Sequence, residues 1–200
     1  GDRVVVVPAD MADDDSVIAL AEAAEAVAGH VDVLVNNAGV GGTTPAELET
    51  MERWRSTMAV NLDGLFLLSQ QVGLGMIERG HGSIVNIASI LGLVGSAPIK
   101  QAAYCASKGA VVNLTRELGA QWGRKGVRVN AIAPGWFMSE MTEQDMFGDD
   151  SSMEFIRRNA PMGRAGEEHE LDGALLFLAS NASTYVTGQT IAVDGGWTAR

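Results

Sequence analysis

A tyrosine and a lysine lie four residues apart in the middle of the chain, in the segment Tyr104-Cys-Ala-Ser-Lys108. In a helix this spacing places both side chains on one face, one turn apart. A tyrosine has an ordinary pKa of about 10, and a nearby ammonium group lowers it because it stabilises the phenolate. Such a phenol can donate or accept a proton near neutral pH, as the interconversion of an alcohol and a carbonyl requires. Taken singly, Lys108 could equally be a helix-end lysine that reaches water, and Tyr104 an ordinary residue at the edge of the core.

Two further polar residues occupy positions that could serve the same chemistry. Asn61 interrupts an apolar helical stripe, either as part of a site or as a buried amide that ties two elements together. Ser89 directly follows a short apolar segment, residues 83–87. If that segment is a strand, Ser89 lies at the carboxyl edge of a sheet, where open α/β sheets bind their ligands. Its hydroxyl could then hold the oxygen of a substrate.

Short apolar segments alternate with helical patterns along the chain. Between them, apolar residues recur at intervals of three and four, and Thr44-Pro45-Ala46-Glu47 has the pattern of a capped helix start. This alternation predicts an α/β fold with a parallel, doubly wound sheet. No repeat, charge block or low-complexity stretch divides residues 1–200, so we expect a single domain. The segments expected to form buried strands are 4–7, 32–36, 83–87, 127–132 and 190–193.

The composition argues against several classes of function. The chain has 14 Lys and Arg against 25 Asp and Glu, a net charge of −11, which disfavours binding to nucleic acid or to an anionic membrane surface. The single cysteine, Cys105, excludes an internal disulfide, and the three histidines lack the spacing of metal ligands, so we expect no metal site. Apolar runs such as residues 65–68 are far too short to span a membrane. The cytoplasm is the expected location.

Several short motifs, taken in their order, resemble those of the short-chain dehydrogenase/reductase family. The segment from Tyr104 to Lys108 resembles the Y-x-x-x-K signature of that family. The resemblance extends over essentially the whole chain. It implies a Rossmann-type fold of three α/β/α layers. It also implies an oxidoreductase with NAD or NADP as cofactor and a small-molecule secondary alcohol or ketone as substrate. The other matching motifs are Asn36-Asn37-Ala38-Gly39, Val60-Asn61-Leu62, Ile87-Ala88-Ser89, Pro134-Gly135 and Asp194-Gly195-Gly196.

The resemblance also implies a role for each matching residue. Tyr104 would be the acid/base, and Lys108 would lower its pKa and hydrogen-bond the nicotinamide ribose. Ser89 would hold the substrate oxygen, and Asn61 would support a water molecule in a proton relay to Lys108. Residues 136–166 would form the substrate loop, either as an apolar lid or as two small helices packed on the sheet. Besides Tyr104 and Lys108, the residues expected to contact the cofactor, from adenine to nicotinamide, are Asp10, Met11, Asn37, Ala38, Gly39, Pro134, Gly135, Phe137 and Ser139.

The chain departs from the family pattern at its start. It contains no G-x-G-x-x-G or T-G-x-x-x-G-x-G phosphate-binding motif, and Gly39-Val-Gly41-Gly42 has the wrong spacing. We therefore expect a Rossmann sheet that lacks its first two strands, and we hypothesise that the chain is a fragment of a longer enzyme. In the Rossmann strand order those two strands lie between residues 4–7 and 32–36. We expect 4–7 to have no neighbour and 32–36 to have a bare edge. The preference between NAD and NADP stays open.

The substrate and the assembly leave alternatives. A 3-oxoacyl-carrier reductase and a sugar-acid dehydrogenase are both possible, whereas Pro134-Gly135 and the short tail after Asp194 disfavour a nucleotide-sugar epimerase. The chain could also be a catalytically silent fragment or an oligomerisation module. Ser96 is an alternative hydroxyl to Ser89, because the interval from Ser89 to Tyr104 is slightly longer than in much of the family. The intact enzyme is expected to be a homotetramer, with a second buried helix face made of Leu62, Phe66, Leu67, Val112 and Leu114.

Overall fold

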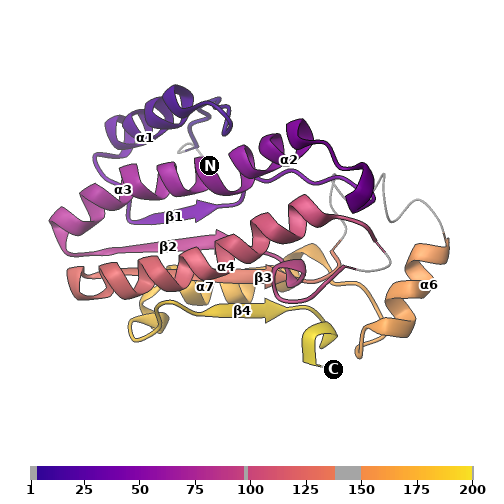
Figure 1. The fold of residues 1–200 in the computed structure, drawn as a ribbon. Coiled ribbons are helices and arrows are strands. Elements are labelled where there is room, and N and C mark those ends of the chain that lie inside the picture. Colours follow the sequence, from indigo (N-terminus) through magenta and orange to yellow (C-terminus); the bar gives the residue numbers. More distant parts are fainter. Residues whose placement is uncertain (1–3, 97–98, 138–149, 200) are drawn as a thin grey trace.

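The computed structural model describes residues 4–96, 99–137 and 150–199, which build a parallel sheet with helices on both faces (Figure 1). Its four strands lie in the order β1-β2-β3-β4, and each neighbouring pair is parallel. The expected Rossmann-type, doubly wound α/β fold, without the first two strands of that fold in these 200 residues, is confirmed. The strands are β1 (Val33–Asn36), β2 (Gly82–Ile87), β3 (Val127–Pro134) and β4 (Thr190–Val193).

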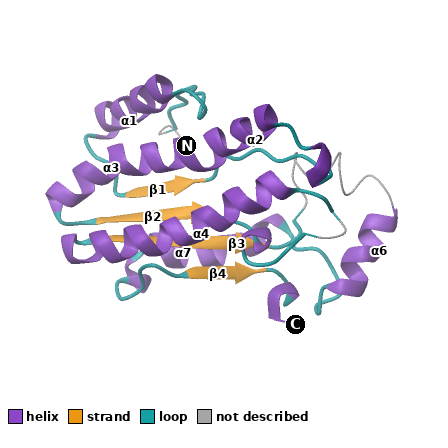
Figure 2. Ribbon diagram, in the orientation of Figure 1, coloured by secondary structure: helices purple, strands orange, loops and turns teal. Residues whose placement is uncertain are grey.

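The helices form the outer layers (Figures 1 and 2). Helices α3 (Leu65–Arg79) and α4 (Ala102–Trp122) cover one face, α1 (Asp14–Ala28) packs against α3, and α7 (Asp172–Ala179) covers the other face. Successive residues of β2 serve opposite layers, as the pleat of a strand requires. Ile84 belongs to the core beneath α3 and α4, and Val85 packs with Leu178 of α7. No helix in the described part of the chain is long and apolar enough to cross a membrane.

Residues 4–7 do not form the expected strand, and that prediction is wrong. Val4 and Val6 are 82% and 83% exposed, and the segment has no partner in the sheet. A strand is stabilised by hydrogen bonds and side-chain pairs with a neighbour, and this segment has none among the described residues. The bare edge expected beside 32–36 is confirmed, since among the described residues β1 pairs with β2 alone. Val33 and Val35 remain partly exposed.

The helix start expected at Thr44 also lies elsewhere in the structure. Thr44-Pro45-Ala46-Glu47 does not begin a long helix; it leads into a single 3-10 turn, Ala46–Leu48, without a side-chain cap. Helix α2 (Met51–Met58) begins later, where the Thr50 hydroxyl accepts a hydrogen bond from the Arg53 N–H at 3.2 Å. The Thr44 N–H instead donates to the Lys100 carbonyl at 2.7 Å. This bond fixes the segment before α2 to the segment before α4.

Candidate active site

A cavity of about 620 Å³ lies where the carboxyl ends of β1, β2 and β3 meet the first turns of α4. Ligand sites of open α/β sheets are expected at this edge. The cavity brings together residues that are far apart in the sequence, and most of the predicted site residues are among them. Its walls are formed by Asn37, Ala38, Gly39, Ile87, Ala88, Ser89, Tyr104, Lys108, Pro134, Gly135, Phe137, Glu168 and Leu171.

Ser89, Tyr104 and Lys108 form a connected group on these walls. The Tyr104 side chain lies close enough to Ser89 for that side chain to lower its pKa. Lys108 lies one helical turn further, with its Nζ 5.7 Å from the centre of the Tyr104 ring, within the range of a cation–π contact. Its ammonium donates to the Ile87 carbonyl at 2.7 Å, and the residue is only 4% exposed. Lys108 is therefore a buried lysine whose charge faces the cavity, and it does not reach out to water.

Burial controls the pKa values of both titratable groups. It lowers the pKa of Lys108 to about 8. Burial also raises the pKa of Tyr104 above 10.0, although the Ser89 side chain acts in the opposite direction. The net direction for Tyr104 is opposite to the lowering expected from a neighbouring ammonium group. In the chain without cofactor, desolvation of the phenolate outweighs the favourable contacts.

Asn61 is fully buried in a π-helical segment, Ala59–Gly64, which joins α2 to α3. Its Oδ1 accepts from the Val40 N–H at 2.7 Å, and its Nδ2 donates to the Val40 carbonyl at 2.8 Å and to Ser107 Oγ at 3.0 Å. The amide thus ties the loop after β1, through Val40, to α4, through Ser107. Gly39 precedes this anchor, and a Cβ there would lie 3.4 Å from both Asn61 Oδ1 and Lys108 Nζ.

The cavity suits the nicotinamide half of a dinucleotide. Two of its wall positions are glycines that bring main chain close to neighbouring groups, Gly39 beside Lys108 and Gly135 beside Asp194. Asn37, Ala38, Pro134 and Phe137 line it as expected. The Gly-rich phosphate motif is not found in the 200 residues, so the fit concerns this half of the cofactor.

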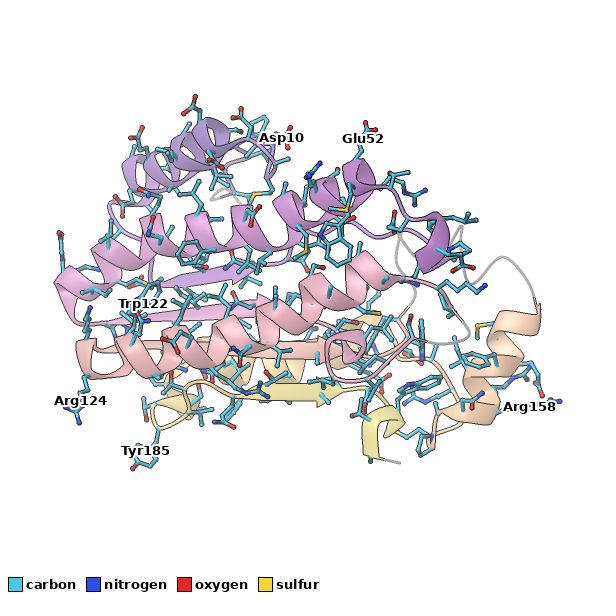
Figure 3. All side chains as sticks on the ribbon, in the orientation of Figure 1. Asp10, Glu52, Trp122, Arg124, Arg158 and Tyr185 are labelled. Atoms are coloured by element: carbon cyan, nitrogen blue, oxygen red, sulfur yellow. The ribbon has the colours of Figure 1, made fainter. Side chains whose placement is uncertain are left out.

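Two predicted cofactor contacts, Asp10 and Met11, are not part of the described walls of this cavity. Asp10 lies at the surface near the start of α1 (Figure 3), where its Oδ1 accepts from the Ala12 N–H at 2.9 Å. Met11 packs its main chain against Gly64. Ser139 lies outside the described residues. The alternative hydroxyl, Ser96, is bonded to the Ile99 carbonyl and does not line the cavity.

Sequence reasoning missed Glu168 and Leu171, which come from the 3-10 turn Glu168–Leu171 and complete the cavity wall. A signal was present in the capping box formed by Glu167 and Glu170. Arg164 binds Glu170 through two hydrogen bonds of 2.7 and 2.8 Å, and this pairing holds the pKa of the Glu170 carboxyl at about 2.

Within the predicted substrate loop, residues 138–149 lie outside the described chain, and helix α6 (Asp150–Asn159) follows them. Helix α6 packs through the fully buried Ile156, in a cluster with Trp136. The Trp136 ring stands edge-on to that of Trp197, with centroids 5.3 Å apart. The helix that the structure describes in this loop, α6, is therefore packed on the fold. Among the residues that the structure describes, no group of three or more His, Cys, Asp or Glu is placed to hold a metal ion.

Known proteins match this chain over nearly its full length. A protein-family model described as enoyl-(acyl carrier protein) reductase matches residues 1–198. The galactitol 2-dehydrogenase (L-tagatose-forming) of Cereibacter sphaeroides is 48% identical over 191 residues, which are 95% of this chain and 74% of that protein. The gluconate 5-dehydrogenase of Gluconobacter oxydans is 42% identical, over 94% of this chain and 73% of that protein.

A solved structure agrees with these sequence matches. The gluconate 5-dehydrogenase from Burkholderia cenocepacia, crystallised with NADP and tartrate, superposes with a TM-score of 0.90 at 41% identity. The match covers 96% of this chain and 74% of that one. The motifs, the parallel sheet and these matches agree, and the chain belongs to the short-chain dehydrogenase/reductase family of NAD(P)-dependent oxidoreductases.

Proposed function

We propose that the protein interconverts a secondary alcohol and the corresponding ketone with NAD or NADP, and that Tyr104 exchanges the proton with the substrate oxygen. The observation that carries this proposal is that Ser89 and Tyr104 lie together on the wall of the large cavity, close enough for the Ser89 side chain to affect the pKa of Tyr104. Two hydroxyl groups that meet there can both contact one substrate oxygen. Carbonyl chemistry needs such a pair, one group to hold the oxygen and one to move its proton.

The neighbouring residues support this proton transfer. Lys108 places an ammonium one turn from Tyr104, and a bound substrate that excludes water would strengthen its effect on the phenolate. Its low pKa, caused by burial, also makes it able to pass a proton on near neutral pH. Asn61 acts through Val40 and Ser107, and it keeps the loop after β1 against the cavity. A water relay from Asn61 to Lys108 remains part of the proposal.

Residues around the cavity would hold the nicotinamide nucleotide. When bound, this cofactor accepts or supplies the hydride. The protein's contribution is to hold and orient it beside Tyr104. Lys108 and Tyr104 would contact the ribose, and the other residues expected around the cofactor line the same cavity, namely Asn37, Ala38, Gly39, Pro134, Gly135 and Phe137. The NADP bound to the solved gluconate 5-dehydrogenase of Burkholderia cenocepacia supports the choice of cofactor class.

The relatives favour a polyhydroxy substrate over an acyl-carrier substrate. The galactitol and gluconate dehydrogenases both act, by their names, on compounds with several hydroxyl groups. We infer that this protein oxidises one secondary hydroxyl of a polyol or of a sugar acid. The reductase in the name of the matched family model describes a class of relatives, and the identities of 48% and 42% favour the dehydrogenases.

We also propose a homotetrameric assembly. Phe66 and Leu74 of α3 are 40% and 56% exposed, as expected for a helix face that a second copy covers. Val112, expected on the same face, is already buried within the chain, in a cluster with Leu65. Multi-angle light scattering should give four times the chain mass, and the mass of a monomer at micromolar concentration would contradict the assembly.

The proposed function is tested by titrating the folded protein with NADH and NADPH. Four tryptophans and the reduced nicotinamide provide the fluorescence signal. Saturable binding of at least one coenzyme, followed by its formation from NAD or NADP in the presence of polyols, is the expected result. A protein that is folded by circular dichroism but binds neither coenzyme would contradict the proposal.

A further inference from the structure

A second cavity, of about 350 Å³, shares Tyr104 with the first. Its other walls come from the loop after β1 and from α2 with the turn before it. The wall residues with polar side chains are Glu49, Glu52, Arg53, Ser56 and Thr57. Because Tyr104 borders both cavities, this second space lies beside the residue proposed to exchange the proton.

Glu49 is the unusual member of this wall. Its side chain is only 10% exposed, and its buried Oε1 has no hydrogen-bond partner. The nearest cation is Arg53, whose Nε lies 3.5 Å from that oxygen, too far for an ordinary hydrogen bond. A nearly buried carboxylate is costly unless donors satisfy it. Glu49 therefore has accepting capacity that the described protein leaves unused, on the wall of a cavity.

The segment that leads to Glu49 is attached to α4. The bond from the Thr44 N–H to the Lys100 carbonyl, and the bridge between Thr44 and Gln101, attach the preceding segment to the start of α4. Gly42 leaves room for the Arg53 guanidinium, because a Cβ there would lie 2.9 Å from an Arg53 nitrogen. The loop after β1 and helix α2 thus form one wall, with Glu49 and Arg53 on it.

The charges of this wall select between two kinds of substrate. Two carboxylates, Glu49 and Glu52, stand against one cation, Arg53, which is already paired with Glu49. A substrate carboxylate would meet repulsion and would compete with Glu49 for Arg53. Neutral hydroxyl groups can donate to Glu49 in charge-assisted hydrogen bonds. Ser56 and Thr57 add further hydroxyl partners.

We propose that the Glu49 cavity binds the hydroxyl groups of the substrate remote from the reacting carbon, and that the preferred substrate is a neutral polyol and not a sugar acid. This inference rests on the proposed function, since it names the substrate class of the same site. Glu49 is here a specificity-determining residue. A site that hydrogen-bonds a substrate group discriminates strongly against analogues that cannot satisfy it.

The test compares matched pairs that differ only at one end of the molecule, galactitol with galactonate and glucitol with gluconate. The wild-type protein should show a kcat/KM at least about tenfold higher for the polyol of a pair, equivalent to about 1.4 kcal/mol. Glu49→Gln should lower kcat/KM for the polyol about tenfold, mainly by raising KM. It should also reduce the ratio of kcat/KM between the polyol and the sugar acid of a pair. The control Glu47→Gln changes an exposed carboxylate in the same turn that does not line the cavity, and it should behave as wild type.

A binding measurement separates this inference from the proposed function. Saturation-transfer NMR of galactitol and glucitol should show contact with the wild-type protein and with Tyr104→Phe, and a much weaker signal with Glu49→Gln. Polyol binding through Glu49 without any oxidation would contradict the proposed function alone. Oxidation of secondary alcohols with equal kinetics in wild type and Glu49→Gln, or a wild-type preference for gluconate and galactonate, would overturn the inference alone. Absence of polyol binding to the wild-type protein would overturn it as well.

Discussion

The side chain of Asn61 hydrogen-bonds both main-chain polar groups of Val40, at 2.7 Å to its N–H and 2.8 Å to its carbonyl. The single Asn61 amide thereby satisfies both main-chain polar groups of a loop residue, as a neighbouring strand would do in a sheet. The contact ties the π-helical segment of the long helix to the loop that carries Gly39, on the wall of the catalytic cavity. An asparagine suits this position because it offers an acceptor and a donor together.

Asn61→Ala should therefore destabilise the protein by about 1–3 kcal/mol, because it removes both hydrogen bonds that the buried Asn61 amide makes with the main chain of Val40. Ser107→Ala is the matched control, since it removes a single hydrogen bond to the same amide and should cost about 1 kcal/mol. Urea unfolding followed by circular dichroism measures both. Equal effects for the two variants would contradict the special role of the contact with Val40.

The low pKa of Lys108 predicts a pH-dependent stability in the protein without cofactor. Burial holds this pKa at about 8 in the folded chain, while the unfolded lysine titrates at about 10.4. Between these values the unfolded state binds more protons, so the free energy of unfolding rises with pH. Relative to Lys108→Met, the wild type should gain up to about 3 kcal/mol between pH 7 and pH 10.5. Denaturant melts of both proteins across this range provide the measurement; a constant difference would contradict a depressed pKa.

Gly92 should be sensitive to substitution because the turn Ile90–Gly92, which follows Ser89, packs directly on α4. A Cβ at Gly92 would lie 2.5 Å from the Lys108 carbonyl oxygen. Gly92→Ala should cost about 1–3 kcal/mol of stability and lower kcat by displacing Ser89 from Tyr104. Gly95→Ala is the control, since a Cβ there meets no atom within 4 Å. Thermal unfolding measures the stability of both variants, and alcohol oxidation measures their kcat. Equal stability and equal kcat in Gly92→Ala and Gly95→Ala would argue against tight packing of this turn.

Ser89→Ala should shift the pH profile of alcohol oxidation to higher pH. The Ser89 side chain lowers the pKa of Tyr104 against the larger effect of burial, so its loss leaves burial less opposed. The same change removes one contact to the substrate oxygen, and kcat should fall by at least about tenfold. Rate measurements across the alkaline range test both effects. An unchanged profile with only a raised KM would mean that Ser89 binds substrate without acting on Tyr104.

The repeating apolar patterns allowed the strands and long helices to be predicted because each is set by local residues. The limits of β4 were predicted residue for residue, and those of β1 and β2 to within one residue. The segment 4–7 has the same composition as these strands but fails, because strand formation depends on a neighbour that local sequence does not contain. Likewise, Thr44 has the residue type and position of a helix N-cap but does not begin a long helix. Its N–H donates to the carbonyl of Lys100, more than fifty residues away in the sequence.

The motifs predicted most of the cavity wall for a similar reason. Ser89, Tyr104 and Pro134 follow strands or begin helices at one edge of the sheet, so topology alone brings them together. Glu49 and Glu168 were missed because their role depends on how two irregular segments fold back. The direction of the Tyr104 pKa was also missed, since it follows from burial, which a sequence motif does not specify.

The most direct test of Tyr104 as the acid/base is to measure turnover and coenzyme binding in Tyr104→Phe beside the wild type. The phenylalanine keeps the ring and removes only the hydroxyl to which proton transfer is assigned. Turnover of a polyol should fall by at least about 10²-fold, while the Kd for the reduced coenzyme stays within about threefold of the wild-type value. Near-full activity in Tyr104→Phe, with coenzyme binding intact, would contradict Tyr104 as the acid/base.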